Sequence, residues 1–226
     1  MMGARELSCS LKKFNPGIPL IILSGTEDDI NSRGEELSKL GMHRTVEDIS
    51  FENRIKERFG LNWIKLRVWE WIEYDALIVI DADAIVQANI THLFGLPTDF
   101  AWVTHNGEGG FDANRGGFLM VRPCIKTFYS MMHYLHSHKH YQFETSYAEQ
   151  DFLTWYYRYT AFDLPGRYNV NFGYVDEHGM GPDGTKAAVL HFADDRHKDG
   201  FFRAQPGSDI WPYLCYQPQH TELETI

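Results

Sequence analysis

Short apolar runs alternate with amphipathic stretches along most of the chain. Runs of four or five residues rich in aliphatic and aromatic side chains predict buried strands at residues 19–23, 76–80, 100–103, 118–121 and 187–190. A shorter strand is predicted at residues 46–49. Apolar side chains at helical spacing predict helices at residues 5–14, 28–40, 62–71 and 146–159, and another after Pro123. Strands that alternate with helices in this way indicate an α/β domain.

The size of the chain allows one substantial domain. At 226 residues it is short for two domains, and no repeat, low-complexity segment or linker divides it. Hydrophobic residues make up 43% and charged residues 23%, which is the composition of a globular protein with a real core. We therefore predict a single domain over residues 1–226.

The net charge of the chain argues against some classes of binding partner. The formal net charge is −10 and Lys and Arg are not clustered, so nucleic acids and anionic membrane surfaces are poor partners. An acidic protein that binds a nucleoside diphosphate needs a metal ion to mask the charge. No apolar run approaches the roughly 18 residues of a membrane span, and the start has no signal-peptide pattern.

Cysteine usage is sparse. Cys9, Cys124 and Cys215 are odd in number and far apart, which argues against a disulfide framework or a cysteine-rich zinc site. Three such cysteines favour a reducing compartment.

The acidic motif Asp81-Ala82-Asp83 follows directly on the apolar run at 76–80. Side chains alternate across a strand, so two carboxylates two residues apart leave its end on the same side. Like charges so close together repel one another unless a cation lies between them. In open α/β sheets this is also where ligands bind. The motif therefore indicates a divalent metal ion with water and a phosphate-bearing substrate in its shell; the alternative is a pair of acidic residues that mark where a strand reaches the surface.

Six segments carry a resemblance to a known family. In order they are KLRVW at 65–69, YDALIVIDAD at 74–83, NITHLF at 89–94, RGGFLMVRP at 115–123, EQD at 149–151 and VLHF at 189–192. Together they resemble glycosyltransferase family 8, which contains glycogenin and the bacterial lipopolysaccharide galactosyltransferases. The resemblance runs from about residue 3 to residue 200. It implies a GT-A nucleotide-diphospho-sugar transferase fold, with a mixed central sheet flanked by helices.

The resemblance also implies a metal ion and a donor. Members of the family hold manganese with both carboxylates of the Asp-x-Asp motif and a distant histidine, which correspond here to Asp81, Asp83 and His191. Imidazole, carboxylate, water and phosphate oxygens suit Mn²⁺, and Mg²⁺ is the alternative. The donor implied is a UDP-sugar, whose hexosyl group passes to a glycan, lipid or protein acceptor with retention of anomeric configuration. Ala82 lies within the motif that would contact the donor.

Basic residues are expected near the diphosphate. Lys65 matches the lysine that the family uses beside the donor sugar and diphosphate, although its helix must fold back to bring it to Asp81. Lys198 lies where relatives offer a basic residue to the phosphates. The spacing is off by one, so Arg196 or His197 is an alternative.

Small residues precede the predicted strand at 118–121. Asn114, Arg115, Gly116 and Gly117 occupy the segment where relatives show Asn-Ser-Gly or Asn-Ala-Gly, with Asn displaced by one position and Arg115 in its place. Glycine lets a donor sugar approach the backbone closely. Arg115 is either a clamp for an acidic sugar or phosphate, or a structural substitution.

The segment at 149–151 is expected beside the anomeric carbon. Glu149-Gln150 falls where many relatives have Asp-Gln, and the extra methylene of Glu149 moves its carboxylate outward. Its role would be that of a nucleophile or of an electrostatic stabiliser. Asp151 is the alternative acid, although neighbours on a helix project about 100° apart.

The opening of the chain departs from the usual order. A nucleotide-binding α/β domain opens with a buried strand, whereas this chain opens on the helix predicted at residues 5–14. We therefore expect a GT-A fold in which the first strand is missing or replaced by another segment.

Two other functions are compatible with the pattern. A non-catalytic relative that binds a nucleotide sugar would explain the changes at Asn114 and Glu149. A haloacid dehalogenase-type phosphatase would use Asp81 as nucleophile and the segment DDRHKD at 194–199 as a late metal motif, but its nucleophile normally ends the first strand. The sequence leaves open the sugar, the acceptor, the oligomeric state (a homodimer included) and the compartment, cytoplasm or, with an N-terminal anchor, Golgi lumen.

Overall fold

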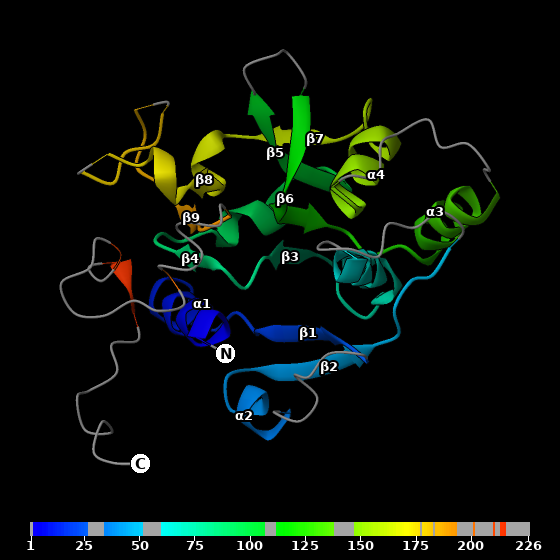
Figure 1. Cartoon of the computed structure of the whole chain (residues 1–226), viewed down its shortest axis with the longest axis horizontal. Helices are drawn as coiled ribbons and strands as arrows, with labels where there is room; N and C mark the ends of the chain where they lie inside the picture. Colours follow the sequence, from blue (N-terminus) through cyan, green and yellow to red (C-terminus); the bar gives the residue numbers. More distant parts are fainter. Residues whose placement is uncertain are drawn as a thin grey trace.

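Three groups of paired strands form the β-structure of the part of the chain that is described (Figure 1). The structure is a computed structural model, and it describes residues 2–26, 34–51, 60–106, 112–137, 147–176, 178–182, 184–193, 201, 210 and 213–215. The strands are β1 (Ile21–Gly25), β2 (Met42–Val46), β3 (Leu77–Ile80), β4 (Ala84–Val86), β5 (Phe100–Asn106), β6 (Asp112–Val121), β7 (Phe162–Leu164), β8 (Val170–Asn171) and β9 (Val189–His191). The helices are α1 (Met2–Phe14), α2 (Gly34–Ser38), α3 (Ile125–Ser137) and α4 (Glu149–Tyr156), with 3₁₀ helices η2 (Gly60–Glu70), η3 (Thr91–Gly95), η4 (Gly166–Tyr168) and η5 (Phe172–Tyr174).

The strands pair in both directions, as the prediction of a mixed sheet requires. One sheet has the order β3-β6-β5-β7, a second has the order β4-β9-β8, and β1 pairs with β2 alone. Pairing is antiparallel between β3 and β6, β5 and β6, and β4 and β9, and parallel between β1 and β2, β5 and β7, and β8 and β9. Strands β1 and β3 are therefore each at the edge of their group.

Side-chain alternation on the central strands divides the core into two layers. On β6, Leu119 and Val121 pack with η2, α3 and α4, while Phe118 and Met120 on the opposite face pack with α1 and β4. Successive residues of a strand point to opposite faces, so an uninterrupted apolar run is buried on both sides. This explains why the apolar runs in the sequence predict the central strands well.

The differences from the predicted elements have local causes. The strand expected at residues 46–49 is wrong: β2 lies earlier, at Met42–Val46, because pairing with β1 recruits a half-polar segment. Helix α2 covers only part of the predicted 28–40, of which residues 28–33 lie outside the described residues. The sequence analysis argued against a disulfide framework and did not predict the disulfide that joins Cys9 of α1 to Cys215. A sequence separation of 206 residues gives no spacing signal for such a pair.

The described residues contain no helix that combines the length and apolar character needed to cross a bilayer. The prediction of one domain over residues 1–226 stays a prediction.

Candidate metal centre and its surroundings

The two acidic residues of the Asp-x-Asp motif lie at a turn and not on a continuous strand. Strand β3 ends at Ile80, Asp81 still donates its backbone N–H to Gly117 of β6, and the chain then turns through Ala82 and Asp83 into β4. The alternation argument for the two carboxylates was therefore not the correct reason. The turn nevertheless directs both of them to one place.

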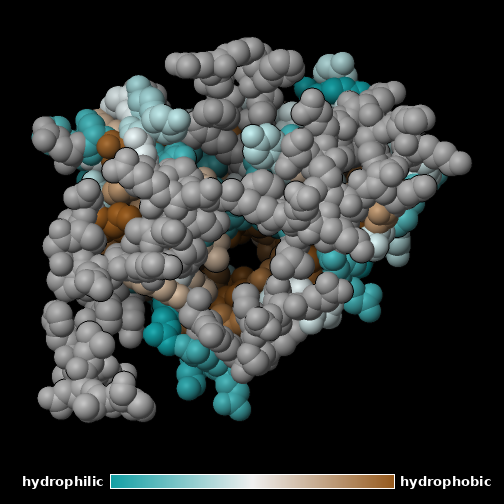
Figure 2. All heavy atoms as spheres, in the orientation of Figure 1, coloured by the Kyte–Doolittle hydropathy of each residue, from teal (hydrophilic) through white to brown (hydrophobic). Residues whose placement is uncertain are grey.

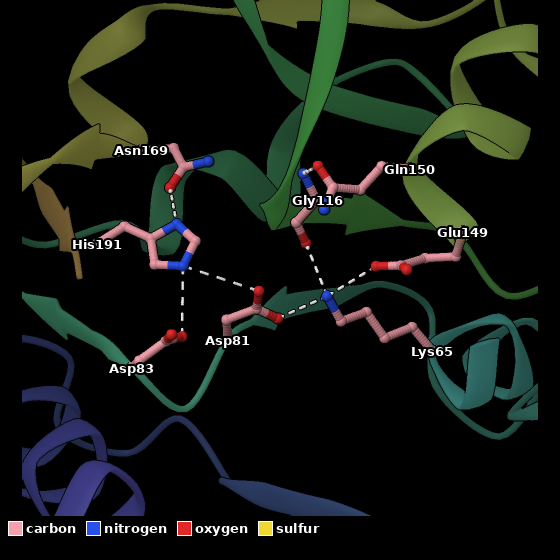
Figure 3. Close-up of polar contacts among 8 residues, drawn as sticks. All are labelled: Lys65, Asp81, Asp83, Gly116, Glu149, Gln150, Asn169 and His191. Carbon is pink, nitrogen blue, oxygen red and sulfur yellow. Dashed lines mark hydrogen bonds and ion pairs between the residues drawn. The ribbon is translucent and has the colours of Figure 1, made fainter. Parts of the chain in front are cut away.

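His191 reaches the motif through strand pairing. It is the last residue of β9, and the antiparallel register of β4 with β9 sets it opposite Ala84, one residue after Asp83. The backbone N–H of Phe192 donates to the carbonyl of Asp83 (2.9 Å), which closes this end of the pair. The His191 Nε2 atom lies 3.3 Å from Asp83 Oδ1 and 3.8 Å from Asp81 Oδ2 (Figure 3). The short antiparallel pair of β4 with β9 thus brings together residues that are more than 100 positions apart in the sequence.

The other ring nitrogen of His191 is held by Asn169, a residue that the sequence analysis missed. Asn169 Oδ1 lies 3.0 Å from His191 Nδ1, and both side chains are buried. An amide oxygen only accepts, so Nδ1 carries the hydrogen and the Nε2 lone pair of the neutral ring faces the carboxylates. The signal that could have found Asn169 is its place immediately before β8, which pairs with β9 and sets Asn171 opposite His191.

These three ligand atoms form a set that a divalent cation fits. One atom each from Asp81, Asp83 and His191 all lie within 4.8 Å of one another. Two carboxylate oxygens and one imidazole nitrogen with a free lone pair suit Mn²⁺ and related metal ions. A hydrogen bond to the outer ring nitrogen is the usual companion of a metal-binding histidine. The residues therefore fit the metal ion that the sequence predicts.

Lys65 lies between two carboxylates. Its Nζ atom is 2.7 Å from Asp81 Oδ1 and 2.8 Å from Glu149 Oε1, and it donates to the carbonyl of Gly116 at 3.3 Å (Figure 3). Helix η2 thus brings Lys65 to Asp81, as expected. Burial alone would lower the pKa of Lys65, but the adjacent Asp81 and Glu149 outweigh it and raise the pKa above its ordinary value. The side chain is therefore a fixed cation that orients Asp81 from the side opposite His191.

Glu149 is fully buried at the start of α4. Its side chain is 0% exposed, and among the described residues its Oε2 atom has no hydrogen-bond partner. Burial raises the pKa of Glu149 to about 7, and the attraction of Lys65 offsets only part of that effect. This carboxylate contacts Lys65 from a fully buried position. The expectation that it faces a sugar stays a prediction.

Gly116 and Gly117 leave room for side chains of the site. A Cβ atom on Gly117 would lie 2.3 Å from Cε1 and 2.4 Å from Nδ1 of His191, and one on Gly116 would lie 2.4 Å from Cγ of Gln150. Real Cβ contacts are essentially never below 3.0 Å. His191 and Gln150 therefore make close approaches that require glycine at these two positions. The expectation that a donor sugar also approaches the backbone here stays a prediction.

The two residues after Glu149 differ in position. Gln150 Oε1 accepts a hydrogen bond from the Gly116 backbone N–H at 3.2 Å, so Gln150 lies at the site beside β6. The Asp151 carboxylate instead accepts from the backbone N–H of Tyr147 at 2.8 Å and so binds the N-terminal end of its own helix. The structure therefore brings Lys65, Glu149 and Gln150 together but does not bring Asp151 to them.

Several predicted residues cannot be placed in this way. Lys198, with its alternatives Arg196 and His197, lies outside the described residues. Asn114 and Arg115 belong to β6 by their backbone, but their side chains are outside what is described. Their roles stay predictions.

Comparison with known proteins gives relatives in sequence and in fold. No protein-family model matches the chain. It is 24% identical over 197 residues to galactinol synthase 1 of Solanum lycopersicum, covering 78% of this chain and 57% of that protein. It is 28% identical over 159 residues to UDP-glucuronate:xylan alpha-glucuronosyltransferase 1 of Arabidopsis thaliana, covering 69% of this chain and 23% of that protein. The chain spans about half the length of the galactinol synthases that it matches.

Solved structures agree on the fold. The galactosyltransferase LgtC in complex with donor and acceptor sugar analogues superposes with a TM-score of 0.60 at 13% identity, over 93% of this chain and 95% of that chain. GlyE of Streptococcus pneumoniae superposes with a TM-score of 0.62 at 15% identity, over 89% of this chain and 57% of that chain. The predicted GT-A fold is confirmed. Sequence relatives and fold both agree with the resemblance of the chain to glycosyltransferase family 8.

Proposed function

We propose that this protein is a metal-dependent retaining glycosyltransferase that moves a hexosyl group from a UDP-sugar to a glycan, lipid or protein acceptor. The bond between the anomeric carbon and the diphosphate oxygen breaks, the acceptor hydroxyl oxygen forms the new bond, and the hydroxyl proton is released. The observation that carries the proposal is the convergence of Asp81, Asp83 and His191 within 4.8 Å. Relatives whose names include a UDP-glucuronate donor and galactosyl transfer support it.

A bound Mn²⁺, or Mg²⁺ in its place, would neutralise the charge of the departing UDP. Asp81 and Asp83 would hold the metal ion through carboxylate oxygens and His191 through Nε2. Lys65 keeps Asp81 in place and adds positive charge beside the diphosphate site. Because Lys65 already contacts two carboxylates, its Nζ atom is positioned before any donor binds.

Glu149 and Gln150 have separate roles in this proposal. We infer that Glu149 is a positioning residue for Lys65 and not a nucleophile, because its side chain is 0% exposed and ion-paired. Gln150 is the residue of the pair that would contact the donor sugar, since it lies against β6 at Gly116. The arrangement therefore provides no exposed carboxylate from α4 at the reacting carbon, which favours electrostatic stabilisation over a covalent intermediate.

The test combines a screen of sugar donors with a measurement of UDP binding. The protein would be incubated with UDP-galactose, UDP-glucose, UDP-glucuronate and UDP-N-acetylglucosamine, with Mn²⁺ or with EDTA, and release of UDP measured. One donor should be hydrolysed in a Mn²⁺-dependent manner, and calorimetry should show Mn²⁺-dependent UDP binding. The Asp83→Ala variant should lose that binding and remain folded, and the His191→Ala variant should lose part of it. Asp75→Asn, at an exposed position shortly before β3, is the matched control.

The result of the screen also separates the alternatives. Binding of UDP with neither hydrolysis nor transfer to any glycan would favour the non-catalytic relative. Unchanged UDP binding by the Asp83→Ala variant would contradict the metal site. The haloacid dehalogenase-type phosphatase is excluded by the GT-A fold.

The disulfide between Cys9 and Cys215 supports a proposal about the cellular compartment of this protein. Disulfides persist in oxidising compartments and are rare in the cytosol, and Cys9 is bonded to Cys215. Of the two compartments considered from the sequence, we propose the Golgi lumen. Thiol alkylation of the native protein followed by mass spectrometry tests the disulfide on which this proposal rests. Cys9 and Cys215 should resist alkylation, and two free thiols would contradict the proposal.

A further inference from the structure

The described residues that follow β9 return to the sheet that carries His191. We call residues 201, 210 and 213–215 the C-terminal segment. Its side chains of Phe201, Ile210 and Leu214 are buried, and they form one apolar cluster with Ile85 of β4, Val170 of β8, and Leu190 and Phe192 on either side of His191. The rings of Phe192 and Phe201 stack with their centroids 4.5 Å apart. The C-terminal segment thus covers the β4-β9-β8 sheet.

This cluster lies on the face of the sheet opposite to the metal-ligand side chains. Leu190 and Phe192 directly precede and follow His191, and successive side chains of a strand point to opposite faces. On one face, Leu190 packs against the C-terminal segment. On the other face, the imidazole of His191 meets Asp81 and Asp83. The C-terminal segment therefore supports the histidine strand from behind.

The sheet that carries His191 is too small to be stable without such support. Strands β4 and β9 have three residues each and β8 has two. Small sheets of short strands need packing on an apolar face to be stable in water. Here Leu190 and Phe192 are both 0% exposed, and the ring of Phe172 also stacks on Phe192 with the centroids 4.8 Å apart. Loss of the C-terminal segment would open this face to water and loosen the strand that ends at His191.

The large apolar cavity of the molecule is a separate feature. It has a volume of about 660 Å³ and is lined by β1 and β3, with Lys65 and Asp81 at the end of β3 among its lining residues. Figure 2 shows it as an opening surrounded by hydrophobic side chains. The described residues that line it include neither His191 nor any member of the cluster on the C-terminal segment. The histidine is thus held from the opposite side, by this cluster and by Asn169.

A disulfide fixes the C-terminal segment to helix α1. Cys215 is bonded to Cys9, and its backbone N–H donates to the buried carboxylate of Glu6 at 2.7 Å. Figure 1 shows the last described residues, in red, on the same side of the molecule as α1. Helix α1 in turn contacts β4, where the Ser10 hydroxyl accepts a hydrogen bond from the backbone N–H of Val86 at 3.2 Å. The disulfide therefore closes a ring of contacts from β4 through α1 and the C-terminal segment to β9.

We propose that the C-terminal segment positions His191 for metal binding and that reduction of the Cys9–Cys215 disulfide weakens the metal site. Both cysteines are partly exposed, so a thiol reductant can reach them. Two reductant thiols are oxidised to a disulfide, and Cys9 and Cys215 take up the two electrons and two protons as free thiols. The inference rests on the metal site of the proposed function and adds a structural element on which its affinity depends.

The first experiment measures metal affinity. Mn²⁺ is titrated by electron paramagnetic resonance into the wild type, the Cys9→Ser/Cys215→Ser double variant and the Phe201→Ala variant, each under conditions in which urea unfolding curves show it to be folded. Both variants should bind Mn²⁺ at least about tenfold more weakly, as is typical when a histidine ligand loses its support. The Phe201→Leu variant should recover most of the affinity, because leucine keeps an apolar cover over Phe192.

Matched controls separate position from general stability. The Phe128→Ala variant removes a ring that is also buried but belongs to a different cluster, with η2 and α3. It should lower the urea midpoint and keep wild-type Mn²⁺ affinity. The wild type reduced with dithiothreitol and desalted should bind like the double variant, and reoxidation should restore it; the Cys124→Ser variant should behave like the wild type throughout. Wild-type affinity in both the double variant and the Phe201→Ala variant would overturn the inference, as would an equal loss in the Phe128→Ala variant.

A measurement without metal ion distinguishes this inference from the proposed function. The backbone N–H of Phe192 donates to the Asp83 carbonyl, so its hydrogen exchange reports how firmly β9 is held at the metal ligands. In EDTA it should exchange at least about tenfold faster in the double variant and the Phe201→Ala variant than in the wild type and the Phe128→Ala variant. A wild type that binds no Mn²⁺ but shows this difference would contradict the proposed function and support the positioning role. Equal exchange in all four forms would overturn that role.

Discussion

Asn169 accepts a hydrogen bond from the Nδ1 atom of His191 and thereby leaves the Nε2 atom of that ring to face Asp81 and Asp83. The distance is 3.0 Å, and Asn169 is almost completely buried. The geometry of the metal-ligand cluster therefore depends on a residue that contacts no metal ion.

Replacement of Asn169 by leucine should weaken metal binding without removing a ligand. The imidazole would lose the partner that fixes its tautomer and orientation, and loss of such a partner typically costs 10–100-fold in metal affinity. Titration of Mn²⁺ followed by electron paramagnetic resonance measures this directly. The Asn171→Ser variant, in which the replaced side chain caps η5 instead, should bind Mn²⁺ like the wild type. Equal affinity in the Asn169→Leu variant would show that the hydrogen bond is incidental.

Replacement of Gly117 by alanine should displace His191. The new methyl group would lie 2.3 Å from the imidazole ring, and the ring has no room to remain where it is. Affinity for Mn²⁺ should fall at least about tenfold, by the same loss of ligand orientation. The Gly95→Ala variant is the control, because nothing lies within 4 Å of its new Cβ atom. Retained affinity in the Gly117→Ala variant would mean that His191 is not a ligand.

The buried carboxyl of Glu149 should make stability depend on pH. Its pKa is raised to about 7 in the folded protein from 4.5, so the folded state keeps a proton that the unfolded state has already released. Rising pH therefore destabilises the wild type relative to the Glu149→Gln variant, starting near pH 4.5 and levelling off above pH 7. The full difference is about 3 kcal/mol. Urea unfolding at pH 4, 5.5, 7 and 8 measures it, and a difference that is constant across this range would contradict the raised pKa.

Loss of the disulfide should destabilise the fold. The bond links residues 206 positions apart, and its removal is expected to cost about 2–5 kcal/mol by freeing the unfolded chain. Urea unfolding of the Cys9→Ser/Cys215→Ser double variant measures the loss. The Cys124→Ser variant removes the free cysteine and is the control. If the double variant unfolds at the same urea concentration as the control, the bond does not contribute to stability.

The sequence predicts the parts of this protein that depend on local patterns. Apolar runs such as residues 118–121 become central strands because burial on both faces requires an uninterrupted apolar sequence. The predicted meeting of Asp81, Asp83 and His191 is also found, since the resemblance to the family carried long-range information. The full burial of Glu149 beside Lys65 could not be predicted, because it is a property of packing that a single residue type does not reveal.

Other features depend on contacts between segments that are far apart in the sequence, so local sequence patterns do not predict them. Strand β4 has only three residues and directly follows an acidic turn, so its apolar character is too brief to indicate a strand. Strand β8 is shorter still, and Asn169 gains its importance only from the neighbour that pairing supplies. The bond between Cys9 and Cys215 likewise exists because the fold brings the two ends of the chain together.

The register in which Ala84 lies opposite His191 also constrains how the chain can change in length. Because side chains alternate along a strand, one residue inserted into β9 would turn the imidazole to the opposite face of its sheet. Insertions within the loop between β8 and β9 leave that alternation intact. Homologous enzymes should therefore tolerate loops of many lengths before Ala187, yet keep a fixed number of residues from there to the histidine.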